Sequence, residues 1–562
     1  MDKIKVLALG GLDEDGKDLY CIEINNDIFV IGAGFKYPTR TTPGIDFVIA
    51  DFDYLKNNKE RIKAYILPKG KKNSFGAIPY IYKHAPAPIY CCLITKILLE
   101  KFSKDYNQEN DYDFKIIELP SNIKIANRLF TFFSTCASMP STFGLAINTS
   151  LGNIVYSGDF IVEYSNENNF KLDLNTLGKI AENPTLLLLS ESQNCQKSGY
   201  CSPAHRIYPR LIKILHEQTG RVFIALNSDN LYHIDEVYRA CNDCNKKIFL
   251  YANESKEVYN LRKIKDLKRF PNSNIIELDE INRVKESSLV ILMMDENEKI
   301  YEKVSLLANN ENDNQQIKIN PNDTFYLAAP PTDNSEIICT STIDELYKTN
   351  CKVYYETRNS LAKMHAYEED LKMLLSLLKP KYYFPIEGYY VSLLANAKMA
   401  YDMKIGLSHN SIYLLDNGQS LVIDEKGAKV DFNVDQKVKI GDLMIDGIGV
   451  GDVVNEIILQ RNRLGEDGVV VLGCAISKSK RAMVAGPDVQ MRGFLFLKDR
   501  DADNMSKEIT KFFIQNVNNW INETKNFDSK DLTNKIVYQL EKLLLKNNNR
   551  NPVILPNILI ID

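Results

Sequence analysis

The chain has 562 residues, with a hydrophobic fraction of 44% and a charged fraction of 25%, values typical of a globular protein with several domains. Its formal net charge of −4 excludes a globally basic nucleic-acid binder but allows a local basic channel. No apolar run approaches the roughly 20 residues of a membrane span. The eleven cysteines lack a repeating spacing, which favours reduced thiols over a disulfide framework. We therefore expect a cytoplasmic protein without membrane association.

The first part of the chain, to about residue 205, is dense in short strand-like segments such as "KIKVLALGG", "LYCIEINN" and "IFVIGAG". Glycine, asparagine and proline separate these segments, as is typical of strands joined by tight turns. The segment "INTSLGNIVYSGDF" predicts a hairpin that turns at residues 151–153. This density of paired strands predicts two mixed sheets with helices outside.

A turn at residues 67–77, "LPKGKKNSFGA", follows the strand-like "RIKAYIL" and leads into a helix start. A strand that enters a sharp turn and then a helix is where α/β enzymes place ligand and metal chemistry. This turn carries Lys69, Lys71 and Lys72 and contains no histidine. The question is therefore whether a catalytic fold has lost its catalytic groups.

From Arg206 the pattern changes to alternating helices and strands: "RIYPRLIKILHEQ", "RVFIALN", "HIDEVYRACND" and "KIFLYAN". This alternation predicts a parallel, doubly wound domain to about residue 360. A helix, a strand and a helix follow, and then "SIYLLDNGQSLVID", which predicts a hairpin that turns on Asn417-Gly418. The last part predicts an α+β module with helices near 503–524 and 529–547 and a terminal strand.

Segments along the whole chain resemble ribonuclease J, a family of metallo-β-lactamase/β-CASP RNA nucleases. They include "ALGGLDEDGKDLY", "FGAIPY", "GNIVYSGDF", "HAYEEDLKMLLSLLKPKYYFPIEGYY", "DGIGVGDV", "AGPDVQMRGF" and "NPVILPNILIID". The last three belong to a C-terminal part peculiar to ribonuclease J within its superfamily. The resemblance implies an α/β fold, in which a Rossmann-like β-CASP domain interrupts a metallo-β-lactamase αββα sandwich and an α+β C-terminal domain follows.

The resemblance also implies the domain boundaries and the chemistry. We place the first part of the metallo-β-lactamase domain at 1–205, the β-CASP domain at 206–360, the completion of the first domain at 361–435, a linker at 436–455 and the C-terminal domain at 456–562. Members of the family cut RNA as 5′-to-3′ exonucleases and as endonucleases. Their two zinc ions sit between the lobes, activate a water and clamp the scissile phosphate.

The positions that bind zinc in the family are mostly changed in this sequence. The family's H-x-H-x-D-H turn falls on Lys69, Lys71, Asn73 and Ser74, its next histidine on Ala137, and its last histidine on Glu387, whereas its aspartate is kept as Asp159. Gly32 stands where the family has an aspartate that buttresses the site. An ammonium near neutral pH has no free lone pair, and two oxygen ligands cannot hold a two-zinc cluster. We expect no metal or other cofactor, with Asp159 and Glu387 as the residual metal candidates.

The lysines of the turn allow two interpretations. Lys69, Lys71 and Lys72 would hold an RNA phosphodiester by charge without cleaving it. Alternatively, the loop faces solvent and its lysines merely replace carboxylates that repel one another once the metal is gone. In either case we expect Asp159 to accept hydrogen bonds or to pair with one of these lysines.

The second set of candidate RNA-binding residues comes from the family's Ser-Gly-His-Ala-Ser turn. It falls here on Lys363, Met364, His365, Ala366 and Tyr367. His365 either contacts a phosphate or, as the sequence alone favours, caps the helix that follows. Asn230 keeps a residue of the family's phosphate-binding strand end, although the neighbouring Asp229 would repel a 5′-phosphate.

Three functions follow from these observations. The first is a catalytically impaired ribonuclease J that acts in RNA processing and decay as an RNA-binding or regulatory subunit, as a homo-oligomer or with an active relative. The second is an active 5′-to-3′ exoribonuclease and endoribonuclease, in which Asp159 and Glu387 hold one Mg²⁺ or Mn²⁺. The third is an RNA- or ribosome-binding module without a nuclease partner.

Overall fold

The computed structural model describes residues 1–561 except 39–41, 165–169, 252–254, 258–260, 262–273, 313, 315, 333, 432–437, 448, 451–454, 494–498, 525–528 and 549. The chain forms two compact units. The first comprises Met1–Tyr37 and Val48–Leu443, and the second comprises Pro38–Phe47 and Met444–Asp562. Among the described helices, none is both long enough and apolar enough to cross a membrane.

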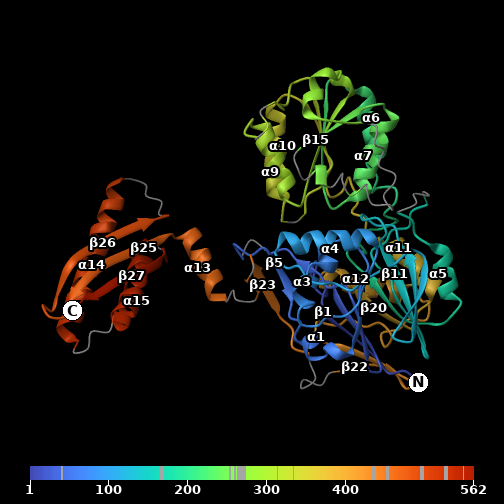
Figure 1. Ribbon diagram of the computed structural model, residues 1–562, viewed down its shortest axis with the longest axis horizontal. Coiled ribbons are helices and arrows are strands. Elements are labelled where there is room, and N and C mark those ends of the chain that lie inside the picture. Colours follow the sequence, from blue (N-terminus) through green and yellow to red (C-terminus); the bar gives the residue numbers. More distant parts are fainter. Residues whose placement is uncertain are drawn as a thin grey trace. The chain divides into compact units, whose positions relative to one another are not determined.

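Two facing sheets make up the main part of the first unit (Figure 1). One has the strand order β22-β21-β1-β2-β3-β6-β7-β8. Its strands are β1 (Ile4–Gly10), β2 (Leu19–Ile24), β3 (Asp27–Ile31), β6 (Ile62–Leu67), β7 (Ile89–Cys91), β8 (Phe114–Ile116), β21 (Ser420–Asp424) and β22 (Gly427–Asp431). A short antiparallel pair, β4 (Phe35–Lys36) and β5 (Phe47–Ala50), accompanies it.

The second sheet has the order β20-β13-β12-β11-β10-β9. Its strands are β9 (Ser121–Ile125), β10 (Arg128–Ser134), β11 (Phe143–Thr149), β12 (Gly152–Tyr156), β13 (Thr185–Glu191) and β20 (Tyr382–Ile386). The two sheets share one apolar core, in which the rings of Phe29 and Phe130 meet edge to face at 5.0 Å. β11 and β12 form the predicted hairpin, with Thr149 opposite Gly152.

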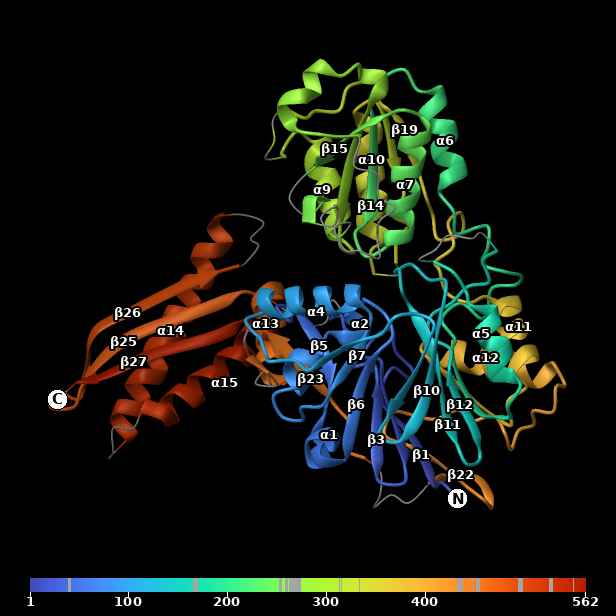
Figure 2. The ribbon, with the colours of Figure 1, turned by 45° about the vertical axis from the view of Figure 1, so that its right-hand side comes forward.

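Helices lie outside these sheets, as the sequence predicts. They are α1 (Asp53–Asn57), α2 (Lys72–Phe75), α3 (Ile78–Ile81), α4 (Leu93–Asp105), α5 (Leu174–Ala181), α11 (Glu368–Leu378) and α12 (Tyr390–Asp402), with a 3₁₀ turn at Lys59–Arg61. Leu177 of α5, Leu371 of α11 and Ala400 of α12 are buried in one cluster with Val155 and Leu188 of the second sheet. These three helices therefore cover its outer face (Figure 2).

A parallel sheet with helices on both faces is inserted between β13 and β20. Its order is β16-β15-β17-β14-β18-β19, and all of its pairs are parallel. Its strands are β14 (Val222–Asn227), β15 (Lys247–Tyr251), β16 (Ile275–Ile276), β17 (Leu289–Asp295), β18 (Thr324–Leu327) and β19 (Lys352–Tyr355). Helices α6 (Tyr208–Glu217) and α7 (Leu231–Asp243) cover one face, and α9 (Lys299–Ala308) and α10 (Glu336–Lys348) cover the other. Two 3₁₀ segments, Leu278–Arg283 and Glu286–Ser288, precede β17. The doubly wound pattern is thus confirmed.

The second unit contains a three-stranded sheet of order β26-β25-β27. Its strands are β25 (Val469–Ser477), β26 (Ala482–Arg492) and β27 (Val553–Ile561), and its helices are α13 (Asn455–Glu466), α14 (Asp499–Glu523) and α15 (Ser529–Asn548). Ile476 packs with Phe513 of α14 and Ile536 of α15, so these helices cover one face of the sheet. The proposed linker, 436–455, lies partly outside the described residues, and its described part includes β23 (Asp442–Asp446) and β24 (Gly449–Val450).

The predicted hairpin at Asn417-Gly418 is wrong. The segment before this turn pairs with β20 instead, because Tyr383 donates its N–H to Ser411 O and accepts the N–H of Tyr413. The Asn417 side chain donates to Leu12 O at 3.0 Å and holds the turn against the N-terminal part of the chain. The hairpin partner of β21 is β22.

Candidate functional site

The candidate site lies where several strands of the two sheets end. Lys69 comes two residues after β6, Asp159 comes three residues after β12, and Glu387 comes directly after β20. β12, β13 and β20 are parallel, so their carboxyl ends lie at one edge of the second sheet. Three of the positions that the resemblance singled out are therefore brought together.

The ammonium of Lys69 lies among three carboxylates. Its Nζ is 2.6 Å from Asp159 Oδ1, 3.3 Å from Glu387 Oε2 and 3.2 Å from Asp18 Oδ2. The Lys69 side chain is only 1% exposed, and the three acids are also buried. We call these four residues the lysine-centred cluster. The expected pairing of Asp159 with a lysine of the turn is thus confirmed, whereas the solvent-facing interpretation is wrong for Lys69.

The charges of the lysine-centred cluster follow from burial and from one another. Burial opposes the charge of Lys69, but the nearby carboxylates of Asp159, Glu387 and Asp18 hold its pKa well above the usual range. Burial also opposes the charge of Asp159, yet the Lys69 ammonium keeps the pKa of this carboxyl well below its usual range. Lys69 and Asp159 are therefore the ionised pair at neutral pH.

The other two carboxyl groups of the cluster behave in the opposite way. Burial raises the pKa of Asp18 to about 6. Burial, followed by repulsion from Asp18, raises the pKa of Glu387 well above its usual range. The Tyr156 hydroxyl donates to Glu387 Oε1 at 2.8 Å. At neutral pH the Lys69 ammonium therefore faces the carboxylates of Asp159 and Asp18, whereas Glu387 retains its proton.

The sequence-based prediction missed Asp18, which precedes β2. Its position depends on Gly32, which has a φ of +70° and whose added Cβ would lie 2.6 Å from Asp18 O. The glycine therefore lets the backbone of Asp18 approach. One signal in the sequence could have indicated Asp18. Gly32 stands where the family has an aspartate, and a missing acid there suggests that a carboxylate from another segment occupies the same region.

The residues present do not fit the two zinc ions that the resemblance implies. The Lys69 ammonium lies within hydrogen-bonding distance of both Asp159 and Glu387, the two residual metal candidates, and so takes the place of a cation between them. Ala137 offers no ligand atom in its side chain. Among the described residues, Asn73 Oδ1 and Ser74 Oγ are buried without a hydrogen-bond partner.

A second arrangement, beside the first, orients His365. Glu191, the last residue of β13, accepts the N–H groups of Phe160 and Ala366 at Oε1, at 2.9 and 3.1 Å. Its Oε2 lies 2.6 Å from His365 Nδ1, so this ring nitrogen donates to the carboxylate. Within the described part of the chain, His365 Nε2 makes no hydrogen bond.

His365 does not cap α11, so the capping interpretation is wrong. The first turn of α11 is capped by Asp370, whose Oδ2 accepts the N–H of Tyr367 at 2.9 Å. Ligand atoms of Asp159, Glu191 and His365 lie within 4.8 Å of one another, a spacing that could hold a metal ion. Asp159, however, already accepts from Lys69.

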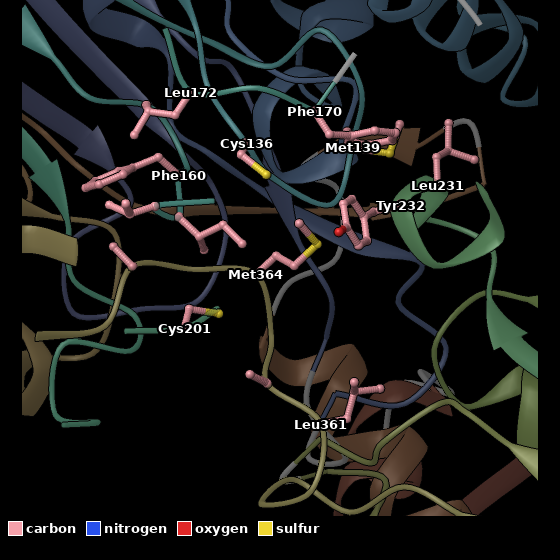
Figure 3. Packing of buried hydrophobic residues seen from close by; sticks show 14 of the residues in the cluster. Cys136, Met139, Phe160, Phe170, Leu172, Cys201, Leu231, Tyr232, Leu361 and Met364 are labelled. Carbon is pink, nitrogen blue, oxygen red and sulfur yellow. The ribbon is translucent and has the colours of Figure 1, made fainter. Parts of the chain in front are cut away.

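The structure separates the remaining predicted RNA-binding residues into buried and accessible ones. Figure 3 shows the thioether of Met364 in an apolar cluster that includes Cys136 and Cys201, and Ala366 is also buried. Lys69, Met364 and Ala366 therefore have no side-chain surface for RNA, which corrects the prediction for these three. The Tyr367 side chain is 8% exposed, whereas Lys363 is exposed.

The three remaining candidates, Lys71, Lys72 and Asn230, differ in the contacts that they make. Lys71 is half-buried and forms no ion pair within the described residues. Lys72 Nζ lies 2.6 Å from Glu296 Oε1. Asn230 is the N-cap of α7, where its Oδ1 accepts the N–H of His233 at 3.1 Å.

Comparisons with known proteins give one family. Residues 219–346 match the model of the ribonuclease J β-CASP domain, and residues 456–561 match that of the ribonuclease J C-terminal domain. Ribonuclease J 2 of Staphylococcus epidermidis strain RP62A is 27% identical over 555 residues, which cover 99% of this chain and 98% of that protein. Ribonuclease J 2 of Staphylococcus aureus strain MRSA252 is 27% identical over 560 residues, with the same coverage.

One solved structure supports the fold alone. A protein of unknown function from Enterococcus faecalis V583 superposes with a TM-score of 0.51 and 13% identity, covering 75% of this chain and 100% of that one.

Proposed function

Because the chain belongs to the ribonuclease J family, we propose that it is a non-catalytic member that binds RNA and serves as a subunit in RNA processing and decay. The observation that carries this proposal is the buried ammonium of Lys69 among Asp18, Asp159 and Glu387. Hydrolysis of a phosphodiester by two metal ions needs a bound water of lowered pKa and open coordination positions. An ammonium that is 1% exposed offers neither.

RNA binding without cleavage is supported by the basic groups beside the cluster, of which Lys363 is exposed, Lys71 is half-buried and His365 is 8% exposed. Glu191 fixes the ring of His365, and the free Nε2, when protonated, donates to a phosphate oxygen. Lys71 and Lys363 add positive charge without carboxylate partners in the described part of the chain. Contacts of this kind position a nucleic-acid backbone irrespective of its sequence.

The second candidate is an active nuclease with a rebuilt metal site, which the grouping of Asp159, Glu191 and His365 favours. One Mg²⁺ or Mn²⁺ would suit its carboxylates. Electrostatics argues against it, since the Lys69 ammonium, 2.6 Å from Asp159, would repel a second cation beside it.

The test is to incubate the purified chain with 5′-monophosphorylated RNA and with zinc, manganese or magnesium in turn. We expect RNA to bind without cleavage, at less than one tightly bound metal ion per chain. Metal-dependent cleavage that disappears in Asp159→Ala would establish the second candidate instead. Cleavage that persists in Asp159→Ala would come from a contaminating nuclease. Both proteins would then be purified further until wild type and Asp159→Ala can be compared.

We also propose that the domains follow the boundaries 1–205, 206–360, 361–435, 436–455 and 456–562, and that the subunit assembles as a homo-oligomer or with an active ribonuclease J. The matches at 219–346 and 456–561 fall inside the second and the last of these segments. Native mass spectrometry of the complex purified from its own cell tests the assembly, which a monomer without co-purifying subunits would contradict.

A further inference from the structure

The β-CASP domain, which contains the parallel sheet, is connected to the domain of the two facing sheets by two segments. One segment, 192–207, leads from β13 to α6, and the other, 356–367, leads from β19 to α11. The two segments are tied to each other, because the N–H of Ala362 donates to Ala204 O at 3.0 Å. Domains that are joined through neighbouring loops move relative to one another by small backbone changes in those loops.

Two ion pairs join the domains on the other side of the parallel sheet. The Nζ of Lys72, the first residue of α2, lies 2.6 Å from Oε1 of Glu296, which directly follows β17. Lys101 of α4 pairs with Glu257, which follows β15. In the sheet order, β15 and β17 lie on one side of β14, whereas β19, from which one connecting segment leaves, forms the opposite edge. The ion pairs and this connecting segment therefore hold opposite sides of the β-CASP domain.

Water reaches all four side chains of these ion pairs. The exposed fractions are 31% for Lys72 and 37% for Glu296, and 47% for Lys101 and 56% for Glu257. An ion pair in such a position changes an equilibrium constant by up to about fivefold and is screened by salt. The two pairs together therefore favour the closed arrangement of the domains by up to about 25-fold, a preference that salt can remove.

One backbone hydrogen bond between the domains depends on the closed arrangement. The N–H of Tyr232 donates to Ser138 O, in the loop after β10, at 3.1 Å. Tyr232 is the second residue of α7, so its N–H has no partner within the helix. The next N–H, that of His233, is bound inside the β-CASP domain by Oδ1 of Asn230 at 3.1 Å. These two neighbouring amides therefore distinguish separation of the domains from fraying of α7.

We propose that the ion pairs Lys72–Glu296 and Lys101–Glu257 form a latch, which keeps the β-CASP domain closed on the two facing sheets and which salt opens. The latch does not depend on the proposed function, because it concerns the arrangement of the domains and not the identity of a ligand. While it is closed, the ammonium of Lys72 is occupied by Glu296. Another anion can pair with Lys72 only by displacing Glu296, so binding of that anion and opening of the latch are coupled.

Hydrogen exchange of the full chain, read by mass spectrometry with fragmentation that resolves single amides, tests the latch. In the wild-type protein, a rise from about 50 mM to about 500 mM salt should speed exchange of the Tyr232 amide at least about fivefold, because the ion pairs are screened. Exchange of the His233 amide should change less than about twofold. The double variant Lys72→Gln and Lys101→Gln should show the fast Tyr232 exchange already at low salt.

An exchange of charges separates the ion pair from other effects of substitution. Lys72→Glu alone places two carboxylates against each other and should speed exchange at Tyr232. Lys72→Glu combined with Glu296→Lys should restore both the slow exchange and its dependence on salt.

The matched control is Lys96→Gln. The Nζ of Lys96 lies 3.1 Å from Oε1 of Glu100, so this ion pair is comparably exposed but lies within α4. Its loss should change exchange at Tyr232 less than about twofold. Circular dichroism checks that all variants are folded.

Each contrary outcome has a definite meaning. Tyr232 exchange that is the same in the wild type and in the double glutamine variant, at both salt concentrations, would overturn the latch. A folded charge-exchange variant that keeps the fast exchange of Lys72→Glu would overturn it as well. Equal acceleration of the Tyr232 and His233 amides would show that α7 frays, and would overturn the assignment to domain opening.

Discussion

The ammonium of Lys69 differs from a bound metal ion because it cannot exchange its ligands or lower the pKa of a water. It can still neutralise the buried carboxylates around it, and because it is part of the chain it does so without a bound metal ion. A buried carboxylate without a partner is costly, so the remaining acids need such a cation. The Lys69 ammonium thus supplies the positive charge that the buried Asp159 carboxylate needs.

A substitution at Lys69 tests this structural role. Lys69→Met keeps the volume but leaves Asp18, Asp159 and Glu387 without a cation, so we expect a loss of about 3–5 kcal/mol in the free energy of unfolding. Lys71→Met, at a half-buried lysine without an ion pair in the described residues, should stay within about 0.5 kcal/mol. Urea unfolding followed by near-UV circular dichroism of tyrosine measures both. Equal effects of the two substitutions would show that Lys69 does not stabilise the fold.

The pH dependence of stability tests the charges of the cluster. Burial raises the pKa of Asp18 to about 6, above its value of roughly 3.9 in an unfolded chain. Between these values the folded state binds the extra proton, so the contribution of Asp18 to stability decreases as the pH rises from about 4 to 6. Asp18→Asn removes this contribution, and the stability of the variant relative to wild type should therefore improve over the same interval. A difference that stays constant with pH would contradict the raised pKa of Asp18.

At the scale of elements, the turn that carries Lys69 is positioned by a close backbone contact. Gly34 lies so near the turn that an added Cβ would be 1.4 Å from Asn73 O. The N–H of Asp18 donates to the same Asn73 O at 3.1 Å, and the N–H of Ala33 donates to Ser74 O at 2.7 Å. The residues after β3 and the turn after β6 therefore hold each other, and with them the lysine-centred cluster.

Gly34→Ala should disturb this contact. Because the clash involves backbone atoms on both sides, we expect a loss of about 1–3 kcal/mol or more in the free energy of unfolding. Gly178→Ala is the matched control, since nothing lies within 4 Å of its added Cβ in α5, and alanine there should stabilise by up to about 1 kcal/mol. Thermal unfolding of the two variants gives the comparison, and a Gly34→Ala protein as stable as wild type would mean that the turn is free to move.

The sequence was sufficient for elements that local patterns define. The strands between glycines and the parallel alternation after Arg206 depend on nearby residues, and the structure confirms them. The hairpin of β11 and β12 is confirmed too, but its turn lies at residues 150–151, because Gly152 and Asn153 already pair within the strands. The turn at Asn417-Gly418 failed because a tertiary partner, Tyr383, pairs with the segment before it. A local turn motif does not indicate which distant strand pairs with the segments on either side of it.

The same distinction holds for the site. The resemblance located Lys69, Asp159 and Glu387, each of which follows closely after a strand, β6, β12 and β20 respectively. It could not provide Asp18, since this residue reaches the cluster only through the space beside Gly32. Nor could it show that Glu191 holds His365, a contact between residues 174 positions apart.

At the scale of the whole molecule, the likeness to known proteins extends along nearly the full chain. Relatives named ribonuclease J 2 align with nearly its full length, and both the doubly wound domain and the C-terminal domain match their family models. The proposed function requires this likeness along the chain, because an RNA-binding subunit without catalytic activity still needs the folded scaffold.

Crystals soaked separately with zinc and manganese, with anomalous diffraction recorded near Lys69, test the central claim most directly. We predict density for the lysine ammonium in contact with Asp18, Asp159 and Glu387, and no anomalous peak within metal–ligand distance of Asp159. Two close anomalous peaks, with the Lys69 side chain displaced, would contradict the claim that this lysine replaces the metal ions.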